Sequence, residues 1–140
     1  MHGGMKVCDM EEMELGYAPQ YGSAKDPINM AGVVASALLR GDHPQVDVEA
    51  VLTSPPDKRP FVVDVRTPQE FSAGSIPGAV NIQVDEIRSR LDEIPCDREI
   101  AAYCQVGQRG YLATRILRQA GFPAGNIGGG YKTYKLFNPR

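Results

Sequence analysis

The chain has 140 residues, of which 42% are hydrophobic and 23% are charged, and its formal net charge is −2. This length is enough for a domain with a substantial core, and the composition is ordinary for a globular protein. The small negative charge and the lack of a basic run argue against binding to nucleic acid or to an anionic membrane surface.

The first predicted element is a helix that starts after Asp26 and stops at Gly41. Asp26 is a suitable N-cap, and Pro27 suits the first helical position. This helix carries an apolar stripe, which could fold back on the rest of the chain, pair with a second copy or stay mobile. Of these we expect a homodimer through residues 28–39. The stripe consists of Ile28, Ala31, Val34, Ala35, Leu38 and Leu39.

The second, larger region alternates short apolar runs with segments of helical periodicity. This order predicts an α/β domain with a parallel sheet that helices cover on both faces. Residues 43–46 are predicted to be a linker in front of it. The predicted strands are residues 61–65, 79–82, 99–103 and 126–127. The predicted helices begin at Asp47, Thr67, Val84 and Gly110, and the last one buries Leu112, Ala113, Ile116, Leu117 and Ala120.

The loop Cys104–Arg109, with the sequence Cys-Gln-Val-Gly-Gln-Arg, joins the third of these strands to the last helix. In such a loop the backbone N–H groups turn inward and the helix N-terminus adds positive potential, so we expect an anion cradle. A thiolate or persulfide at Cys104 would be stabilised there, which predicts a cysteine that is ionised and reactive near neutral pH. The alternative is a buried cysteine beside an unrelated surface arginine.

The length of the loop limits the size of the anionic group that it can bind. It is one residue shorter than the cradle of cysteine phosphatases, so it fits a smaller group, such as the outer sulfur of a persulfide. Gly107 lies where inward-facing amides need dihedral angles that a β-carbon would resist. Arg109 is predicted to bind the substrate anion, to brace the loop, or both. The residues expected to contact substrate at the rim, or to shape the loop, are Gln105, Val106, Gly107, Gln108 and Gly110.

Further segments, together with this loop, resemble the rhodanese family of sulfurtransferases over residues 61–131. They are Phe61–Arg66, Thr67–Phe71, Gly74–Ile82 and Gly128–Tyr131, and they occur in the order typical of the family. One departure is Ser75, where many relatives have histidine. The resemblance implies the rhodanese-like α/β fold and Cys104 as the nucleophile that carries the sulfur.

Asp64 and Arg66 flank the carboxyl end of the first predicted strand of this domain, the edge where open α/β sheets place their sites. One of them can orient the active loop or pair with a neighbouring charge. The alternative is a purely structural ion pair, for example between Arg66 and Glu70.

The N-terminal part has a resemblance of its own. Residues 11–19 and 26–32 resemble the end of the dimerisation domain of flavin-dependent coenzyme A-disulfide reductases, some of which carry a rhodanese domain directly afterwards. The resemblance implies that residues 1–42 are the tail of such a domain, without an FAD or NAD site, and that residues 47–140 are the rhodanese-like domain. The chain then corresponds to the C-terminal end of a fusion, as a fragment or as a shortened natural product.

These features together predict a sulfurtransferase that needs no cofactor and no metal. Its donor would be thiosulfate, a polysulfide or a small persulfide such as that of coenzyme A, and its acceptor would be a thiol or cyanide. The main alternative is a catalytically silent rhodanese module that binds a partner or dimerises. A phosphatase or arsenate reductase is disfavoured by the short loop.

Cys8 and Cys96 have no cradle around them. Cys8 is predicted to lie in a strand or at its edge and Cys96 in a loop; a resolving role for either stays open. The cysteines and histidines lack metal-ligand spacing. An odd number of cysteines argues against a disulfide framework, the longest apolar run is too short to span a bilayer, and the N-terminus shows no secretory signal. We therefore expect a cytoplasmic protein.

Overall fold

The computed structural model describes residues 4–15 and 26–138. The chain forms two compact units, residues 1–43 and residues 44–140. The end of the N-terminal segment 11–19, from residue 16 on, lies outside the described residues. Within the ranges just given, no helix combines the length and the apolar character needed to cross a membrane.

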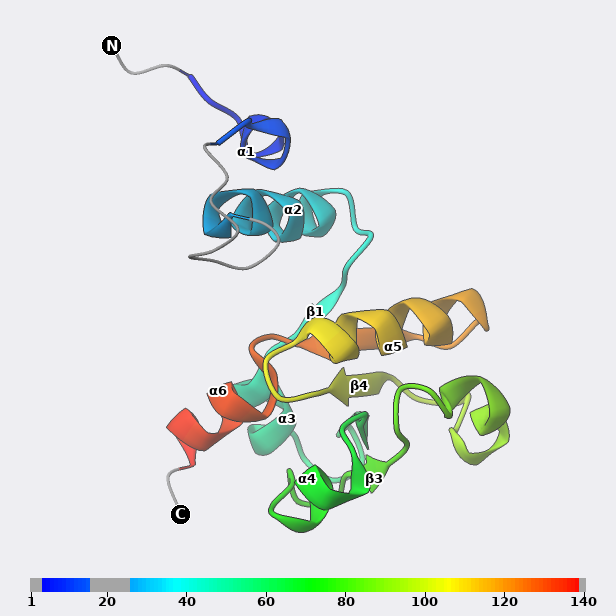
Figure 1. Ribbon diagram of the computed structural model, residues 1–140. Coiled ribbons are helices and arrows are strands. Elements are labelled where there is room, and N and C mark those ends of the chain that lie inside the picture. The colour runs from blue at the N-terminus through cyan, green and yellow to red at the C-terminus, as the bar shows by residue number, and fades with distance from the viewer. Residues whose placement is uncertain (1–3, 16–25, 139–140) are drawn as a thin grey trace. The chain divides into compact units, whose positions relative to one another are not determined.

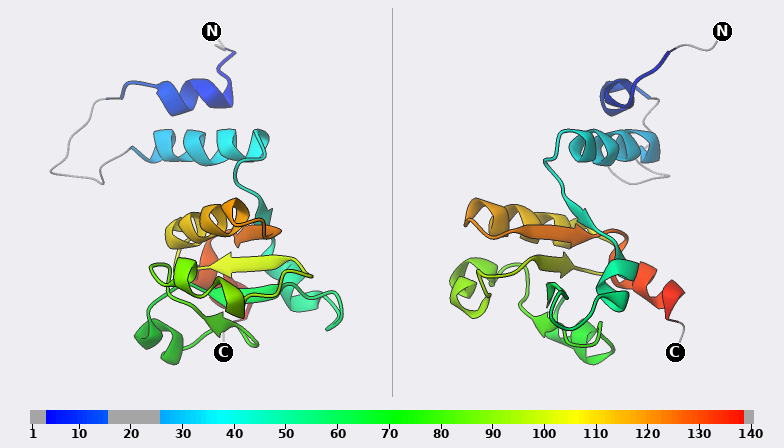
Figure 2. Two further views of the ribbon diagram at one scale, coloured as in Figure 1. Left: turned by 90° about the vertical axis from the view of Figure 1, so that its right-hand side faces the viewer. Right: turned by 180° about the vertical axis from the view of Figure 1, so that it is seen from behind.

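The described residues of the first unit form two helices that lie side by side, α1 (Val7–Glu12) and α2 (Pro27–Leu39) (Figures 1 and 2). The predicted start of α2 is confirmed, because Oδ1 of Asp26 accepts the backbone N–H of Ile28 at 2.8 Å. The strand predicted around Cys8 is wrong, since Cys8 lies in α1.

The two helices touch through small and polar residues of α2 rather than through its predicted apolar stripe. Gly32 is buried, and a Cβ there would come within 2.6 Å of the backbone of α1. The side chain of Asn29 donates a hydrogen bond to the carbonyl of Met13 at 2.8 Å. The apolar stripe therefore lies largely at the surface, with Leu39 78% exposed. The homodimer through residues 28–39 stays a prediction.

The second unit is built on a five-stranded sheet in which every strand pair is parallel. The strand order is β1-β5-β4-β2-β3, so β4 lies at the centre. The strands are β1 (Gln45–Val46), β2 (Phe61–Asp64), β3 (Val80–Asn81), β4 (Ile100–Tyr103) and β5 (Ala124–Ile127). The helices are α3 (Val48–Thr53), α4 (Pro68–Ser72), α5 (Gln108–Gln119) and α6 (Gly130–Phe137), with short 3₁₀ helices η1 (Ile87–Ser89) and η2 (Leu91–Glu93).

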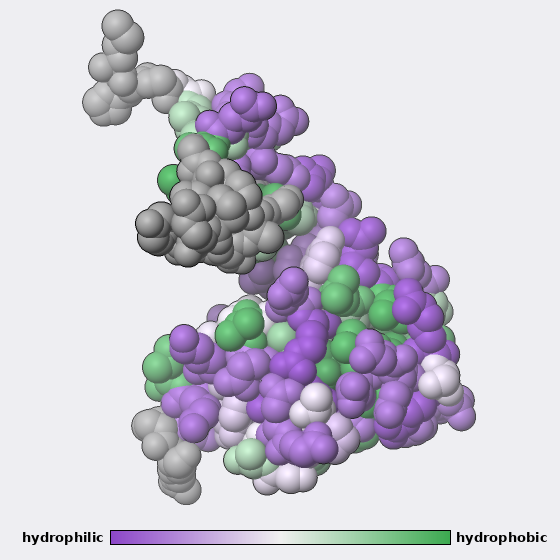
Figure 3. Space-filling view, in the orientation of Figure 1, coloured by the Kyte–Doolittle hydropathy of each residue, from purple (hydrophilic) through white to green (hydrophobic). Residues whose placement is uncertain are grey.

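Successive side chains of β4 enter two different cores, one on each face of the sheet. Ala102 belongs to the core that contains α5, and Cys104 follows on the same face. Tyr103 belongs to the opposite core, which includes residues of α3 and α6. The predicted parallel sheet with helices on both faces is confirmed. On the side seen in Figure 3, the outer surface of this unit is mainly hydrophilic, with apolar side chains in separate small areas.

Three predictions about single elements of this unit are wrong or incomplete. The predicted linker 43–46 contains a strand, because Gln45 and Val46 pair with β5. The helix predicted from Val84 is replaced by η1 and η2, since Arg90 leaves the helical region with φ −125° and ψ 25°. The sequence analysis also did not predict α6, which follows the glycine-rich turn.

The stripe that α5 turns toward the core agrees with the predicted one at Ala113, at Leu117 and at the half-buried Ile116, and it differs at Leu112, Thr114 and Ala120. Gly110 packs against the side chain of Asn126 in β5, which brings the following turn of α5 close to the sheet. The buried residues of α5 are Gly110, Ala113, Thr114 and Leu117, whereas Leu112 and Ala120 are exposed.

Candidate active site

Cys104 lies directly after the central strand β4, at the carboxyl edge of the sheet, and the loop behind it leads into α5 (Figure 1). The cysteine is only 1% exposed. Its sulfur accepts the backbone N–H of Gly107 at 3.1 Å. Because α5 begins at Gln108, the first N–H groups of this helix have no acceptor within it. This arrangement places a backbone N–H on the sulfur in front of a helix N-terminus, at the position where the loop sequence predicts an anion cradle.

Gly107 adopts a backbone conformation that a residue with a β-carbon would resist, with φ at +117°. This conformation aims its N–H at the sulfur of Cys104. Its carbonyl oxygen points the other way and accepts two hydrogen bonds, from the N–H of Tyr111 at 2.8 Å and from Nδ2 of Asn126 at 3.2 Å. Asn126 is buried in β5 and was missed by the sequence analysis. A polar side chain inside an otherwise apolar strand is the signal that could have found it, since such groups need partners.

The N-terminus of α6 fixes the other side of the loop. The N–H of Tyr131 binds the carbonyl of Cys104 at 2.8 Å, and the N–H of Lys132 binds the carbonyl of Gln105 at 3.0 Å. Gly130 lies so close to this strand end that a Cβ there would overlap the carbonyl oxygen of Cys104. The glycine-rich turn that carries part of the family resemblance therefore has a direct role in holding the cysteine.

Asp64 and Arg66 form a buried ion pair beside the cradle, and their side chains are 0% and 2% exposed. Nη2 of Arg66 lies 2.6 Å from Oδ2 of Asp64, and Nε also binds this carboxylate. The guanidinium stacks on the ring of Tyr131, 4.1 Å from its centroid, and lies 5.5 Å from that of Tyr103. Burial alone would lower the pKa of Arg66, but the hydrogen bonds and charge of Asp64 outweigh it and raise this pKa.

Arg66 also reaches the loop itself. Its Nη1 donates to the side-chain oxygen of Gln105 at 3.3 Å, and its Nη2 donates to the carbonyl of Gly74 at 2.7 Å. The alternative pairing of Arg66 with Glu70 is wrong, since each of these residues has another partner. Burial and the bond to Asp64 raise the pKa of Tyr103, whose hydroxyl accepts the N–H of Ile76 at 3.0 Å.

Arg109 makes a two-point ion pair with Glu70, the residue at the third position of α4. Nη1 and Nη2 of Arg109 each lie 2.7 Å from a different carboxylate oxygen of Glu70. Glu70 in turn accepts the N–H of Thr67 at 3.0 Å and its hydroxyl at 3.1 Å, which closes the capping box of α4. The sequence analysis did not foresee Glu70 as the partner of Arg109.

This pairing leads to a prediction for stability at low pH. Arg109 and, less strongly, Thr67 lower the pKa of Glu70 from 4.5 to about 2. A carboxyl group whose pKa falls on folding adds stability above its unfolded pKa and loses it as the pH drops through the folded one. We expect the difference in free energy of unfolding between the wild type and Glu70→Gln to shrink between about pH 4.5 and pH 2. Urea titrations at a series of pH values measure it, and a pH-independent difference would contradict the pairing.

The other loop residues that the sequence predicted for the site lie next to Cys104 in the chain. Gln105 is half-buried and Gly110 is buried, whereas Val106 and Gln108 are exposed, as expected of a rim. Cys8 and Cys96 are free and exposed. In the described ranges, histidines, cysteines and carboxylates nowhere gather in a group that could hold a metal ion.

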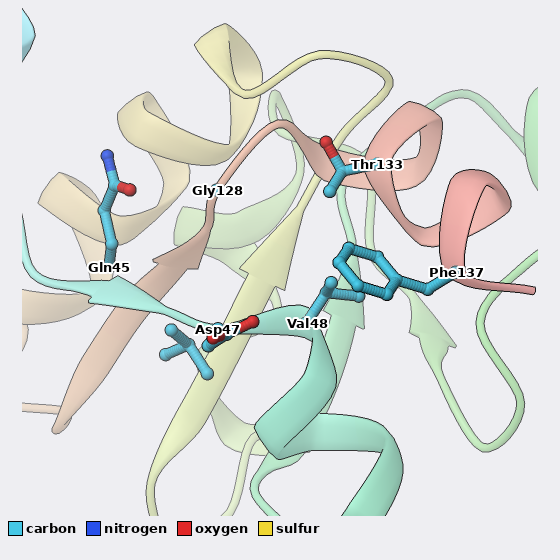
Figure 4. Close-up of a pocket in the computed structure, with 7 residues that line it drawn as sticks. Gln45, Asp47, Val48, Gly128, Thr133 and Phe137 are labelled. Carbon is cyan, nitrogen blue, oxygen red and sulfur yellow. The ribbon is translucent and has the colours of Figure 1, made fainter.

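A separate cavity of about 320 Å³ lies at the carboxyl end of β1, next to α6 (Figure 4). Residues of β1, the start of α3 and α6 line it, among them Gln45, Asp47 and Thr133. It includes no residue of the Cys104–Arg109 loop. Oδ1 of Asp47 is already occupied, because it caps α3 by accepting the N–H of Glu49 at 2.9 Å.

Comparison with known proteins adds two relatives. A sulfurtransferase of Allochromatium vinosum is 43% identical over 62 residues, which are 44% of this chain and 58% of the relative. The human thiosulfate:glutathione sulfurtransferase is 35% identical over 91 residues, 54% of this chain and 79% of the relative. The chain thus spans somewhat more than half of the first relative and most of the second.

Two solved structures resemble almost the whole chain. Reduced CoADR-RHD of Bacillus anthracis is 40% identical with a TM-score of 0.87, over 96% of this chain and 24% of that one. An NAD-dependent persulfide reductase from A. fulgidus is 34% identical with a TM-score of 0.76, over 91% of this chain and 22% of that one. The family model of the rhodanese-like domain matches residues 47–136. With the loop, the sheet and these matches in agreement, the chain belongs to the rhodanese-like domain family.

Proposed function

We propose that this rhodanese-like domain is a sulfurtransferase in which Cys104 carries the sulfur as a persulfide. The observation that carries the proposal is the position of Cys104, whose sulfur accepts the Gly107 N–H at 3.1 Å in front of the N-terminus of α5. The same donors stabilise negative charge on a second sulfur bound to the first. The names of the two curated relatives support a sulfurtransferase as well.

The reaction has two halves. The Cys104 thiolate attacks the outer sulfur of thiosulfate, the sulfur–sulfur bond of the donor breaks, and sulfite leaves with the electron pair. A nucleophilic acceptor, such as a thiolate or cyanide, then attacks the outer sulfur of the Cys104 persulfide and restores the thiolate. A persulfide or polysulfide donor follows the same course with a thiolate or shorter polysulfide as leaving group. The low exposure of Cys104 favours donors whose sulfane sulfur is terminal and unhindered.

Intact-mass spectrometry after incubation with thiosulfate tests this proposal. We expect Cys104 to gain one sulfur atom and to lose it again when cyanide is added. Because Cys8 and Cys96 are exposed and free, the measurement uses the Cys8→Ser/Cys96→Ser variant as the background. Adding Cys104→Ser to this background should abolish the adduct.

If no adduct forms with thiosulfate, polysulfide or a small persulfide, the domain is a silent binding module instead. Hydrolysis of p-nitrophenyl phosphate without sulfur transfer would instead indicate a phosphatase. We include coenzyme A persulfide among the proposed donors because residues 11–19 and 26–32 resemble coenzyme A-disulfide reductases that are fused to a rhodanese domain.

A further inference from the structure

The two arginines near the cradle, Arg109 and Arg66, are each paired with a carboxylate of this chain, which limits the positive charge that a donor meets. We propose that Glu70, acting through Arg109, makes the site discriminate against donors with two negative charges, so that Glu70 is a positioning residue that determines specificity. This inference rests on the proposed sulfurtransferase function, because it names the class of donor at the same cysteine.

Arg109 is held in place by Glu70. Both of its terminal nitrogens face the two oxygens of Glu70 at 2.7 Å, so the guanidinium is held as a fork against a carboxylate. Glu70 is fixed from behind by the backbone and hydroxyl of Thr67. The positive charge that the loop carries at its end is therefore compensated before any donor arrives.

Two other cationic side chains near the loop, Arg66 and Lys132, add little free positive charge. Arg66 contacts Gln105 but is paired with Asp64 inside the domain, so its charge is compensated as well. Lys132 meets the loop through its backbone, but its side chain is exposed, and water and salt screen its charge. Arg109 interacts with Cys104 as well, but its main partner is Glu70. Anion binding in the cradle then falls mainly to backbone N–H groups, such as that of Gly107. These dipoles stabilise one charged sulfur well but supply no net positive charge for a second anionic group.

Two donors isolate this effect, because they differ by one charge and undergo the same reaction. Thiosulfate is a dianion that transfers its outer sulfur and releases sulfite. Methanethiosulfonate is a monoanion that transfers its outer sulfur and releases methanesulfinate. In both cases the Cys104 thiolate forms the new sulfur–sulfur bond, the donor's bond breaks, and the electron pair leaves with the product anion. Cyanide then regenerates the enzyme as thiocyanate forms.

The experiment measures kcat/KM for both donors, with cyanide as acceptor, in the wild type and in Glu70→Gln. Glutamine keeps the shape of the side chain but removes its charge, which frees the charge of Arg109. We expect the ratio of thiosulfate to methanethiosulfonate activity to rise by about threefold or more, the size that one unit charge exerts at a partly solvated site. High salt should reduce this change, since it screens the freed charge.

Glu93→Gln is the matched control. Glu93 forms an ion pair with Arg90 at η2, away from the cradle, and Glu93→Gln removes the same charge from that pair. We expect it to leave the donor ratio unchanged. Merely structural damage in Glu70→Gln would lower both activities together and leave the ratio as it was, which would overturn the inference.

If Glu70→Gln does not fold, the donor ratio is measured in the wild type at a series of salt concentrations. Its ratio of thiosulfate to methanethiosulfonate activity should rise with the salt concentration, because salt screens the repulsion that the Glu70 carboxylate and the Cys104 thiolate exert on the dianion more than on the monoanion. A ratio independent of salt would contradict the inference. Absence of sulfur transfer from both donors in the wild type would instead contradict the proposed function.

Discussion

Replacing Arg66 with methionine should lower the free energy of unfolding by about 3–5 kcal/mol, the range for breaking a buried ion pair from one side. Asp64 is fully buried and takes three hydrogen bonds from the Arg66 side chain, so methionine leaves its carboxylate without this compensation. Methionine also removes the charge that stacks on Tyr131. Urea denaturation, monitored by circular dichroism, measures the loss.

Two further variants show whether the buried charge is the cause. The double variant Asp64→Asn/Arg66→Met should be less destabilised than the sum of its single changes, because it leaves no unpaired charge. Arg90→Met breaks exposed pairs with Glu86 and Glu93, and should cost about 1 kcal/mol or less. A loss for Arg66→Met as small as that for Arg90→Met would contradict the role assigned to the pair.

The regular elements near the site could be predicted because each has a strong local signal. The strands β2 and β4 are continuous apolar runs, and α4 has Thr67 as N-cap, Pro68 at its first position and Glu70 to close the capping box. The cradle itself was visible because a cysteine, a glycine and an arginine follow one apolar strand before a helix. These signals are local, so they survive without knowledge of the rest of the fold.

The partners of the charged residues could not be predicted, because they depend on how distant segments meet. The pair of Arg66 with Glu70 that the alternative considered does not form, because β2 ends with Asp64, whose buried carboxylate binds the Arg66 guanidinium. Glu70 is then free to reach Arg109, 39 residues further along the chain. The strand β1 could not be predicted for a similar reason: Gln45–Val46 is too short to carry a pattern, and it is a strand because β5 pairs with it.

The structure also changes how the loop is understood. The sequence indicates a cradle made by the loop and the helix N-terminus, with Asp64 or Arg66 able to orient it, whereas in the structure three other segments hold the loop in place. Asn126 of β5 binds the carbonyl of Gly107, the N-terminus of α6 binds the carbonyl of Cys104, and Arg66 binds the side chain of Gln105. The loop is thus preorganised from the sheet, from α6 and from the end of β2, which is what electrostatic stabilisation of a bound anion requires.

Replacing Gly107 with alanine should lower kcat for sulfur transfer by about 10²- to 10³-fold, the range for loss of one anion-stabilising N–H. The φ angle of +117° is unfavourable for alanine, so the peptide should relax and turn its N–H away from the sulfur of Cys104. Space is not the problem, since a Cβ at this position would lie 3.7 Å from its nearest neighbour, on Asn126. Single-turnover formation of the Cys104 persulfide, followed by mass spectrometry, measures the rate of the affected step.

Gly121→Ala is the control that separates the loss of the Gly107 N–H from the general cost of placing alanine at a positive φ. Gly121 follows α5, also has a positive φ of +90°, and a Cβ there would meet no atom within 4 Å. Both variants should therefore lose a similar free energy of unfolding, about 1 kcal/mol. Only Gly107→Ala should lose the rate of persulfide formation, because only its N–H faces the sulfur. Equal rates in the two variants would mean that the Gly107 N–H does not stabilise the charge that develops on the transferred sulfur, and that the N-terminus of α5 suffices.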